Sequence, residues 1–371
     1  MLRKFASRPD WQIALAVTAV LRVFYSATAA VFMPFLHPSA RLIQSNSLTE
    51  NLPAPHGMYH ALLGIWERFD TLWFLHIAEH GYDLPMAVIF YPLYPLAIRA
   101  ASWILPPILA ALLVSTSATF FFFWGLLRLA GSELPDKGKF YVLSLVLVWP
   151  TSFILFAGYA ESLTLALIVW AVIFARQGRW GAATVCGLMA GLSRPSGVLV
   201  AIPLLVMAVR SRRAASLPVV LTPLGTLTYW VWLRWSGHSS VVDAYRLHQG
   251  MALVPPWTGF WEALRLMVTQ GDMLLAMKVA ALILFAVLIL RRDTCLEDKL
   301  FGLAVILQML MYTGRPLLGA MRYLLLVYPA FMVLGGYARR QNSKPFIFYL
   351  VALEVLNLSW MWAFLNWSLV L

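Results

Sequence analysis

The residues with the clearest chemical potential lie in one segment, Trp66 to Tyr82. Apolar residues recur there at helical spacing, at Trp66, Phe69, Trp73, Phe74 and Ile77. This pattern predicts an amphipathic helix that lies on the membrane surface and ends at Gly81. Asp70 lies on or beside its apolar face, where a carboxylate is either buried in protein or directed into a cavity, because exposure to lipid is costly. Asp70 is therefore a candidate for acid–base chemistry, and the structural alternative is a helix cap or an ion pair with Arg68 or another outer arginine.

The same segment contains a second pattern, His76-Ile77-Ala78-Glu79-His80, which matches the H-x-x-E-H motif of inverted zinc peptidases. Two histidines one helical turn apart can ligate zinc, and the glutamate can act as a base. A peptidase needs a third zinc ligand as well. Glu161 or Asp83 could supply it, but no other feature of the sequence supports either residue. An intramembrane zinc hydrolase is therefore a minor alternative. We expect His76, Glu79 and His80 to line the site or contact substrate beside Asp70, with the alternative that each histidine is an interfacial helix residue, and we assign no metal site.

The elements that carry these residues belong to a membrane protein. Of the 371 residues, 61% are hydrophobic and 12% are charged, which is more apolar surface than one soluble core can bury. Basic residues stand in short clusters between the apolar runs, so the net charge of +12 indicates membrane topology and not a nucleic-acid partner. Cys186 and Cys295 have neither a metal-ligand spacing nor a disulfide framework.

We predict an all-α polytopic protein with about eleven transmembrane helices, from apolar runs close to the length of a bilayer core. The expected spans are 12–33, 103–127, 140–157, 161–176, 181–194, 197–210, 216–235, 273–290, 299–314, 321–338 and 345–367. A break between two of them, at Ser193 to Gly197, needs polar surroundings because lipid does not satisfy free backbone groups. Without an internal repeat or a separate soluble segment, residues 1–371 are expected to form one integral membrane domain.

The distribution of charge predicts the orientation. With the N-terminus in the cytoplasm, the cytoplasmic connectors hold 17 of the 28 Lys and Arg residues, as the positive-inside rule requires. Acidic residues concentrate on the opposite face, so carboxylate chemistry is expected outside the cytoplasm. Two hydrophilic stretches are long enough to fold there. They are the first extracytoplasmic loop, 34–102, which carries Asp70 and surface helices, and the second, 236–272.

Several motifs follow one another along most of the chain. They are Phe69-Asp70, Phe74 to Tyr82, Phe90 to Leu96 with Arg99, Pro150-Thr151-Ser152, Tyr159 to Leu163, Gly191 to Gly197, and Arg322-Tyr323 before Pro329. In this order they resemble the second mannosyltransferase of GPI-anchor synthesis, the PIG-V type, and its prokaryotic relatives. The resemblance implies a GT-C fold, a helical membrane bundle whose first outer loop carries the catalytic aspartate, here Asp70. It also implies a polyprenyl-phosphate sugar as donor, with mannose favoured.

The chemistry of such a transfer sets the other candidates. A lipid phosphate is already a good leaving group, so an inverting transfer needs one base for the acceptor hydroxyl and cations for the phosphate. Arg194, Arg315 and Arg322 stand at outer ends of predicted spans and are candidates for a phosphate clamp, although each can equally snorkel or pair at a helix end.

Two further substrate-binding candidates stand in the family motifs. Tyr91 belongs to the motif that runs from Phe90 to Leu96, and the resemblance makes it a candidate for substrate binding. Glu161 stands between two spans on the outer face, where it either binds sugar hydroxyls or supports the site.

One other class of protein stays open: a transporter or flippase for a lipid-linked sugar, which would also use intramembrane Arg22 and Glu354. Matched interruptions in the two halves would favour it, and the sequence shows one interruption. For the transferase, the expected partners are the polyprenyl-phosphate donor, membrane lipids, and a glycolipid, glycan or protein acceptor. No cofactor is required, and dependence on a divalent metal is open. The expected location is the plasma membrane in a prokaryote or the endoplasmic reticulum in a eukaryote.

Overall fold

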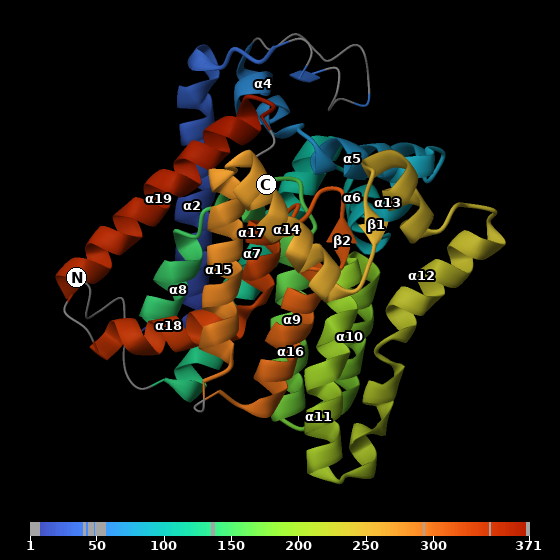
Figure 1. Ribbon diagram of the computed structural model, residues 1–371, viewed down its shortest axis with the longest axis vertical. Helices are drawn as coiled ribbons and strands as arrows, with labels where there is room; N and C mark the ends of the chain where they lie inside the picture. The colour runs from blue at the N-terminus through green and yellow to red at the C-terminus, as the bar shows by residue number, and fades with distance from the viewer. Residues whose placement is uncertain are drawn as a thin grey trace. The chain divides into compact units, whose positions relative to one another are not determined.

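The computed structural model describes residues 8–39, 42–43, 48, 57–134, 138–291, 294–340 and 343–368, and Figure 1 shows their course. Nearly all regular structure is helical, as predicted. Among the described residues, one short antiparallel pair of strands joins β1 (Ala252–Leu253) to β2 (Tyr312–Thr313). Parts of the first predicted loop, including 49–56, lie outside the described residues.

Contacts within the chain divide it into two compact units. The first unit contains Met1–Asp83, Pro92–Ala166 and Gln341–Val370, and the second contains Leu84–Tyr91 and Leu167–Arg340. Each is therefore assembled from segments far apart in the sequence. The two units are described separately below.

The first unit is built on long apolar helices and the short helices of the first loop. Its elements are α2 (Asp10–Phe32), η1 (Met33–Phe35), α4 (Gly57–Leu62), η2 (Gly64–Trp66), α5 (Asp70–His80), α6 (Leu93–Ala101), α7 (Pro107–Glu133), α8 (Gly138–Leu147), η4 (Ser152–Phe156), the start of α9 (Glu161–Arg176) and α19 (Ser343–Leu365). Helix α2 packs along α7. The hydroxyl group of Tyr94 donates to the Ala111 carbonyl oxygen at 2.9 Å, so a buried hydrogen bond fixes α6 against α7.

The second unit contains the rest of α9 and the helices that follow it. Its elements are η3 (Pro85–Ile89), α10 (Trp180–Ser193), η5 (Pro195–Val200), α11 (Ala201–Ser211), η6 (Ala214–Leu221), α12 (Leu224–Trp235), α13 (Val241–Gln249), α14 (Pro256–Gln270), α15 (Met273–Ile289), α16 (Leu296–Met309), α17 (Ala320–Tyr323), η7 (Leu324–Leu326) and α18 (Tyr328–Arg340). Helix α10 packs closely on its neighbours. A Cβ on Gly197 would lie 1.8 Å from the Ala190 carbonyl oxygen, so this packing requires glycine.

The apolar runs of the sequence correspond to helices, but several are short or broken. Among the described residues, four helical segments are long and apolar enough to cross a membrane: Asp10–Phe35, Pro107–Glu133, Ala214–Trp235 and Pro345–Leu365. Four other apolar helices are shorter. The predicted break at Ser193 to Gly197 is confirmed, because Pro195 starts the 3₁₀ turn η5 between α10 and α11. A second break bends the chain by 76° between η7 and α18, at a position where the sequence predicted one continuous span.

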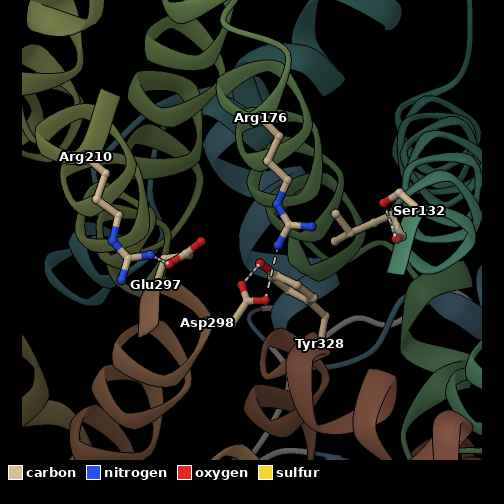
Figure 2. A network of polar contacts seen from close by, with 7 residues as sticks. Ser132, Arg176, Arg210, Glu297, Asp298 and Tyr328 are labelled. Carbon is tan, nitrogen blue, oxygen red and sulfur yellow. Dashed lines mark hydrogen bonds and ion pairs between the residues drawn. The ribbon is translucent and has the colours of Figure 1, made fainter. Parts of the chain in front are cut away.

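A polar network joins helix ends within the second unit (Figure 2). The carboxylate of Asp298 accepts a hydrogen bond from the Tyr328 hydroxyl group at 2.7 Å and pairs with Arg176 at 3.3 Å. Glu297, the preceding residue, pairs with Arg210 at 2.7 Å. Two adjacent carboxylates in the first turn of α16 thereby connect α16 to α9, α11 and α18.

Candidate active site

Asp70 is the first residue of α5 and follows an unusual backbone turn. Phe69 has φ 47° and ψ −118°, a conformation that costs a non-glycine residue about 1–3 kcal/mol and persists only where the surroundings enforce it. The ring of Phe69 is buried against Phe364 and Trp367, with ring centroids 5.5 and 5.6 Å away. The helix therefore starts at Asp70 and not at Trp66 as predicted, although it ends before Gly81 as expected.

Arg68 holds the segment before Asp70 in place. Its side chain is buried, and its guanidinium donates to the carbonyl oxygens of Gly64 at 3.3 Å and Leu365 at 3.4 Å. The same group lies 4.6 Å from the centre of the Trp367 ring, which is a cation–π distance. Burial lowers the pKa of Arg68 to about 10. Arg68 therefore connects the segment before Asp70 to the end of α19.

The turn before α9 packs directly on the first turn of α5. The backbone N–H of Asp70 donates to the hydroxyl oxygen of Tyr159 at 3.4 Å. A Cβ on Gly158 would lie 2.5 Å from Cγ2 of Thr71, so a side chain at position 158 would force this contact to move apart. Glu161 begins α9 one turn later and is 3% exposed. Its burial agrees better with support of the site than with direct contact to a sugar.

These contacts leave Asp70 half-buried at the N-terminus of α5, while Thr71 beside it is fully buried. The helix dipole favours negative charge at this position. Nearby Glu67 is a second, half-buried carboxyl group, and burial raises its pKa while Arg68 opposes the shift. A half-buried carboxylate at a fixed helix start is suited to general-base catalysis.

The H-x-x-E-H residues lie farther along α5. Nε2 of His76 is 2.6 Å from Oδ1 of Asp83, and this hydrogen bond lowers the pKa of the Asp83 carboxyl. The His76 and His80 rings stack with centroids 4.8 Å apart, and Glu79 is exposed. At a rise of about 1.5 Å per residue, the two histidines lie roughly 9 and 15 Å along the helix from Asp70. In the part of the chain that the structure describes, no group of three or more His, Cys, Asp or Glu side chains is arranged to hold a metal ion.

The second unit contains the predicted arginines. Arg194 caps α10, is 9% exposed, and lies 5.1 Å from the centre of the Tyr323 ring. Arg322 precedes that tyrosine in α17, so the fold brings Arg194 close to the α17 turn. Arg315 is exposed in the loop before α17. Lys278 of α15 is 8% exposed and interacts electrostatically with Arg322. Sequence reasoning missed this lysine, although a cation inside an apolar helix was the available signal.

Tyr91 is buried in the second unit. Its hydroxyl oxygen accepts a hydrogen bond from Nε1 of Trp230 at 2.9 Å, and Tyr229 donates to the Val88 carbonyl oxygen at 2.8 Å. These bonds fix the segment 84–91 to α12, and burial raises the pKa of Tyr91. The tyrosine ring therefore has a structural function whether or not its hydroxyl also reaches a substrate.

The chain is similar over about half its length to known sugar transferases. GPI alpha-1,6-mannosyltransferase 2 from Cricetulus griseus is 31% identical over 228 residues, which cover 56% of this chain and 44% of that protein. The resemblance to the PIG-V type is confirmed. The same enzyme from Rattus norvegicus is 30% identical over 222 residues, covering 55% and 43%, and the one from Homo sapiens is 32% identical over 145 residues, covering 34% and 29%. No protein-family model matches.

The chain thus spans less than half the length of the curated relatives it matches. Among solved structures, ArnT from Cupriavidus metallidurans, crystallised with undecaprenyl phosphate, aligns with a TM-score of 0.49 and 12% sequence identity. That alignment covers 94% of this chain and 76% of ArnT.

Proposed function

We propose that this protein is an inverting glycosyltransferase that moves mannose from a polyprenyl-phosphate donor to an acceptor hydroxyl group. The observation that carries the proposal is the fixed position of Asp70, at the start of α5, behind a strained residue and a buried arginine. The similarity to mannosyltransferases supports the choice of sugar. The acceptor is a glycolipid, a glycan or a protein, and the reaction takes place on the extracytoplasmic face, where the charge distribution puts the first loop.

The reaction requires one proton transfer. The carboxylate of Asp70 accepts the proton of the acceptor hydroxyl group as its oxygen attacks the anomeric carbon of the donor. The bond between that carbon and the phosphate oxygen breaks on the opposite side, which inverts the configuration. The polyprenyl phosphate leaves as an anion and needs no protonation. A single base is therefore sufficient, and the protein's second task is to neutralise the phosphate.

We propose that cationic side chains of the second unit bind this phosphate. Arg194 and Arg322 are both held next to Tyr323, and Lys278 adds a third positive charge near Arg322. Arginine suits phosphate because its planar group offers two parallel donors. Arg315, which is exposed, is a further candidate for the same role.

The test is transfer of radiolabelled mannose from its polyprenyl phosphate by purified protein supplied with membrane extract. Asp70→Asn keeps the shape of the side chain and removes the base, so we expect a loss of about 10²–10⁴ in rate with the protein still folded. Asp243→Asn, at an exposed aspartate of the second outer loop, is the matched control and should retain most activity. Full activity in a folded Asp70→Asn protein would remove the proposed base.

The histidines separate this proposal from zinc hydrolysis. For the transferase, His76→Ala and His80→Ala should reduce activity only partly, because both side chains lie well along α5 from the base. A zinc enzyme would lose its metal and all activity in either variant. Metal analysis of the purified protein, together with these two rates, decides between the two chemistries.

A further inference from the structure

Positive charge concentrates on two turns of the second unit. Arg212 and Arg213 are exposed between α11 and η6, and Arg179 is exposed just before α10. Nη1 of Arg213 lies 3.8 Å from the point where a Cβ on Gly178 would stand, so this side chain reaches across to the neighbouring turn. We call Arg179, Arg212 and Arg213 the arginine cluster. Its three residues belong to two turns that the Arg213 side chain brings together.

The carboxylates next to this area are already paired with other arginines. Glu297 pairs with Arg210 and Asp298 with Arg176, as Figure 2 shows. Within the described ranges, no ion pair joins the arginine cluster to a carboxylate, and Arg179 makes only a cation–π contact, 4.8 Å from the centre of the Phe174 ring. The positive charge of the cluster therefore stays available to an external anion.

The turn that carries the cluster is held in a defined shape. Arg212 has φ 51° and ψ 23°, the left-handed conformation that glycine adopts without strain. The buried side chain of Ser216 donates to the Arg213 carbonyl oxygen at 2.6 Å, and the Arg213 N–H donates to Oγ of Ser211 at 3.3 Å. The positive-inside rule explains the sign of the charge at this end, but it does not explain an arginine where glycine would be unstrained.

Apolar side chains flank the cluster on both arms of the hairpin that α11 and η6 form (Figure 1). Val209 is 76% exposed in α11, and Leu217 and Val220 are 68% and 62% exposed in η6. In a membrane protein such side chains contact acyl chains. A ligand that matches both the arginine cluster and these apolar side chains has a negatively charged headgroup and two or more hydrocarbon chains.

We propose that the arginine cluster binds the phosphate headgroup of an anionic phospholipid, whose acyl chains lie along α11 and η6. Arginines bind phosphate with two hydrogen bonds each, and basic groups at the cytoplasmic ends of membrane helices attract anionic lipids. Our topology places this turn in the cytoplasmic leaflet, whereas the sugar donor is proposed to act on the other face. The site is therefore independent of the proposed transfer reaction.

The experiment is native mass spectrometry of the full chain in detergent, titrated with phosphatidylglycerol, phosphatidylcholine or inorganic phosphate. Phosphatidylglycerol should bind, and the combined substitutions Arg179→Gln, Arg212→Gln and Arg213→Gln should weaken it about 10²-fold, since each basic group near a membrane surface contributes about fivefold. The matched control loses the same charge at three exposed arginines elsewhere in the second unit: Arg234→Gln, Arg246→Gln and Arg265→Gln. It should bind phosphatidylglycerol like the unmodified protein.

A second variant tests the proposal if the triple variant does not fold. Arg212→Gly keeps the left-handed turn and removes one charge, so it should fold and bind phosphatidylglycerol about fivefold more weakly. Equal weakening in the cluster and control variants would overturn the proposal, because it would show attraction to net charge alone. Equal binding of phosphatidylcholine would overturn the proposal as well. So would saturation by inorganic phosphate at the same concentration, because it would identify a site for a free anion.

Discussion

The close contact between Gly158 and α5 allows the position of Asp70 to be disturbed without touching its side chain. In Gly158→Ala, the new Cβ would stand 2.5 Å from Cγ2 and 3.0 Å from Oγ1 of Thr71. Carbon atoms in contact lie about 3.5–4.0 Å apart, so the first turn of α5 must move by about 1 Å. Thr71 follows Asp70 directly, and the carboxylate moves with it.

A misplacement of about 1 Å costs about 10² in rate, so kcat should fall about a hundredfold while KM for the donor changes little. Overpacking itself costs about 1–3 kcal/mol of stability, and thermal unfolding should detect it. Thr71→Ala removes both clashing atoms and leaves only Cβ, 3.2 Å from the added methyl group. The double variant should therefore regain about tenfold in kcat, a coupling of about 1.4 kcal/mol.

The assay is the initial rate of mannose transfer by purified variants, with kcat and KM measured separately. Gly181→Ala is the matched control, because an added Cβ there meets no atom within 4 Å, and its rate should equal that of the unmodified protein. Normal kcat in Gly158→Ala would refute the argument that this contact positions the base. Purely multiplicative effects in the double variant would refute it too, since they would show that positions 158 and 71 act independently.

Two more predictions concern the other contacts. Arg68→Met keeps an apolar stem but loses the guanidinium and its hydrogen bonds, so kcat should fall at least about tenfold at constant donor KM. Arg68→Lys should recover part of this loss, and a changed KM alone would contradict a positioning role. Asp298→Asn should destabilise the protein by about 2–3 kcal/mol, less than a fully buried pair would, because Arg176 is 26% exposed. For Arg210→Gln, thermal unfolding should show a loss of stability under about 1 kcal/mol, because the Arg210 side chain is 54% exposed. Equal losses in Asp298→Asn and Arg210→Gln would contradict the assigned difference in burial.

Helices that depend on local pattern could be predicted from the sequence. The apolar run 161–176 matches α9 residue for residue, and Pro195 marked the break before α11 because proline lacks a backbone donor. The bend between η7 and α18 could not be predicted, because Leu324 to Val327 reads as a continuous apolar run. Its direction depends on packing against other helices, which local sequence does not record.

The candidate site shows the same division. Asp70 was found because a carboxylate in an apolar segment is rare, and Gly81 marked the helix end. The predicted start of α5 was wrong because Phe69 adopts a positive φ, a conformation that the residue type phenylalanine does not predict. The contact of Arg68 with Trp367 could not be predicted either, because sequence patterns relate residues that are close along the chain and these two are far apart.

The link between Arg68 and the Leu365 carbonyl joins positions 297 residues apart, and it bears on how the protein is made. A ribosome adds residues one after another, so the segment around Asp70 is synthesised long before α19 exists. Until then the guanidinium has neither that oxygen nor the Trp367 ring as a partner, and Phe69 lacks the aromatic neighbours that enforce its turn. Chains stopped before α19 should therefore insert their early helices yet lack a positioned Asp70, so under the proposed mechanism catalytic competence is one of the last properties that biosynthesis confers.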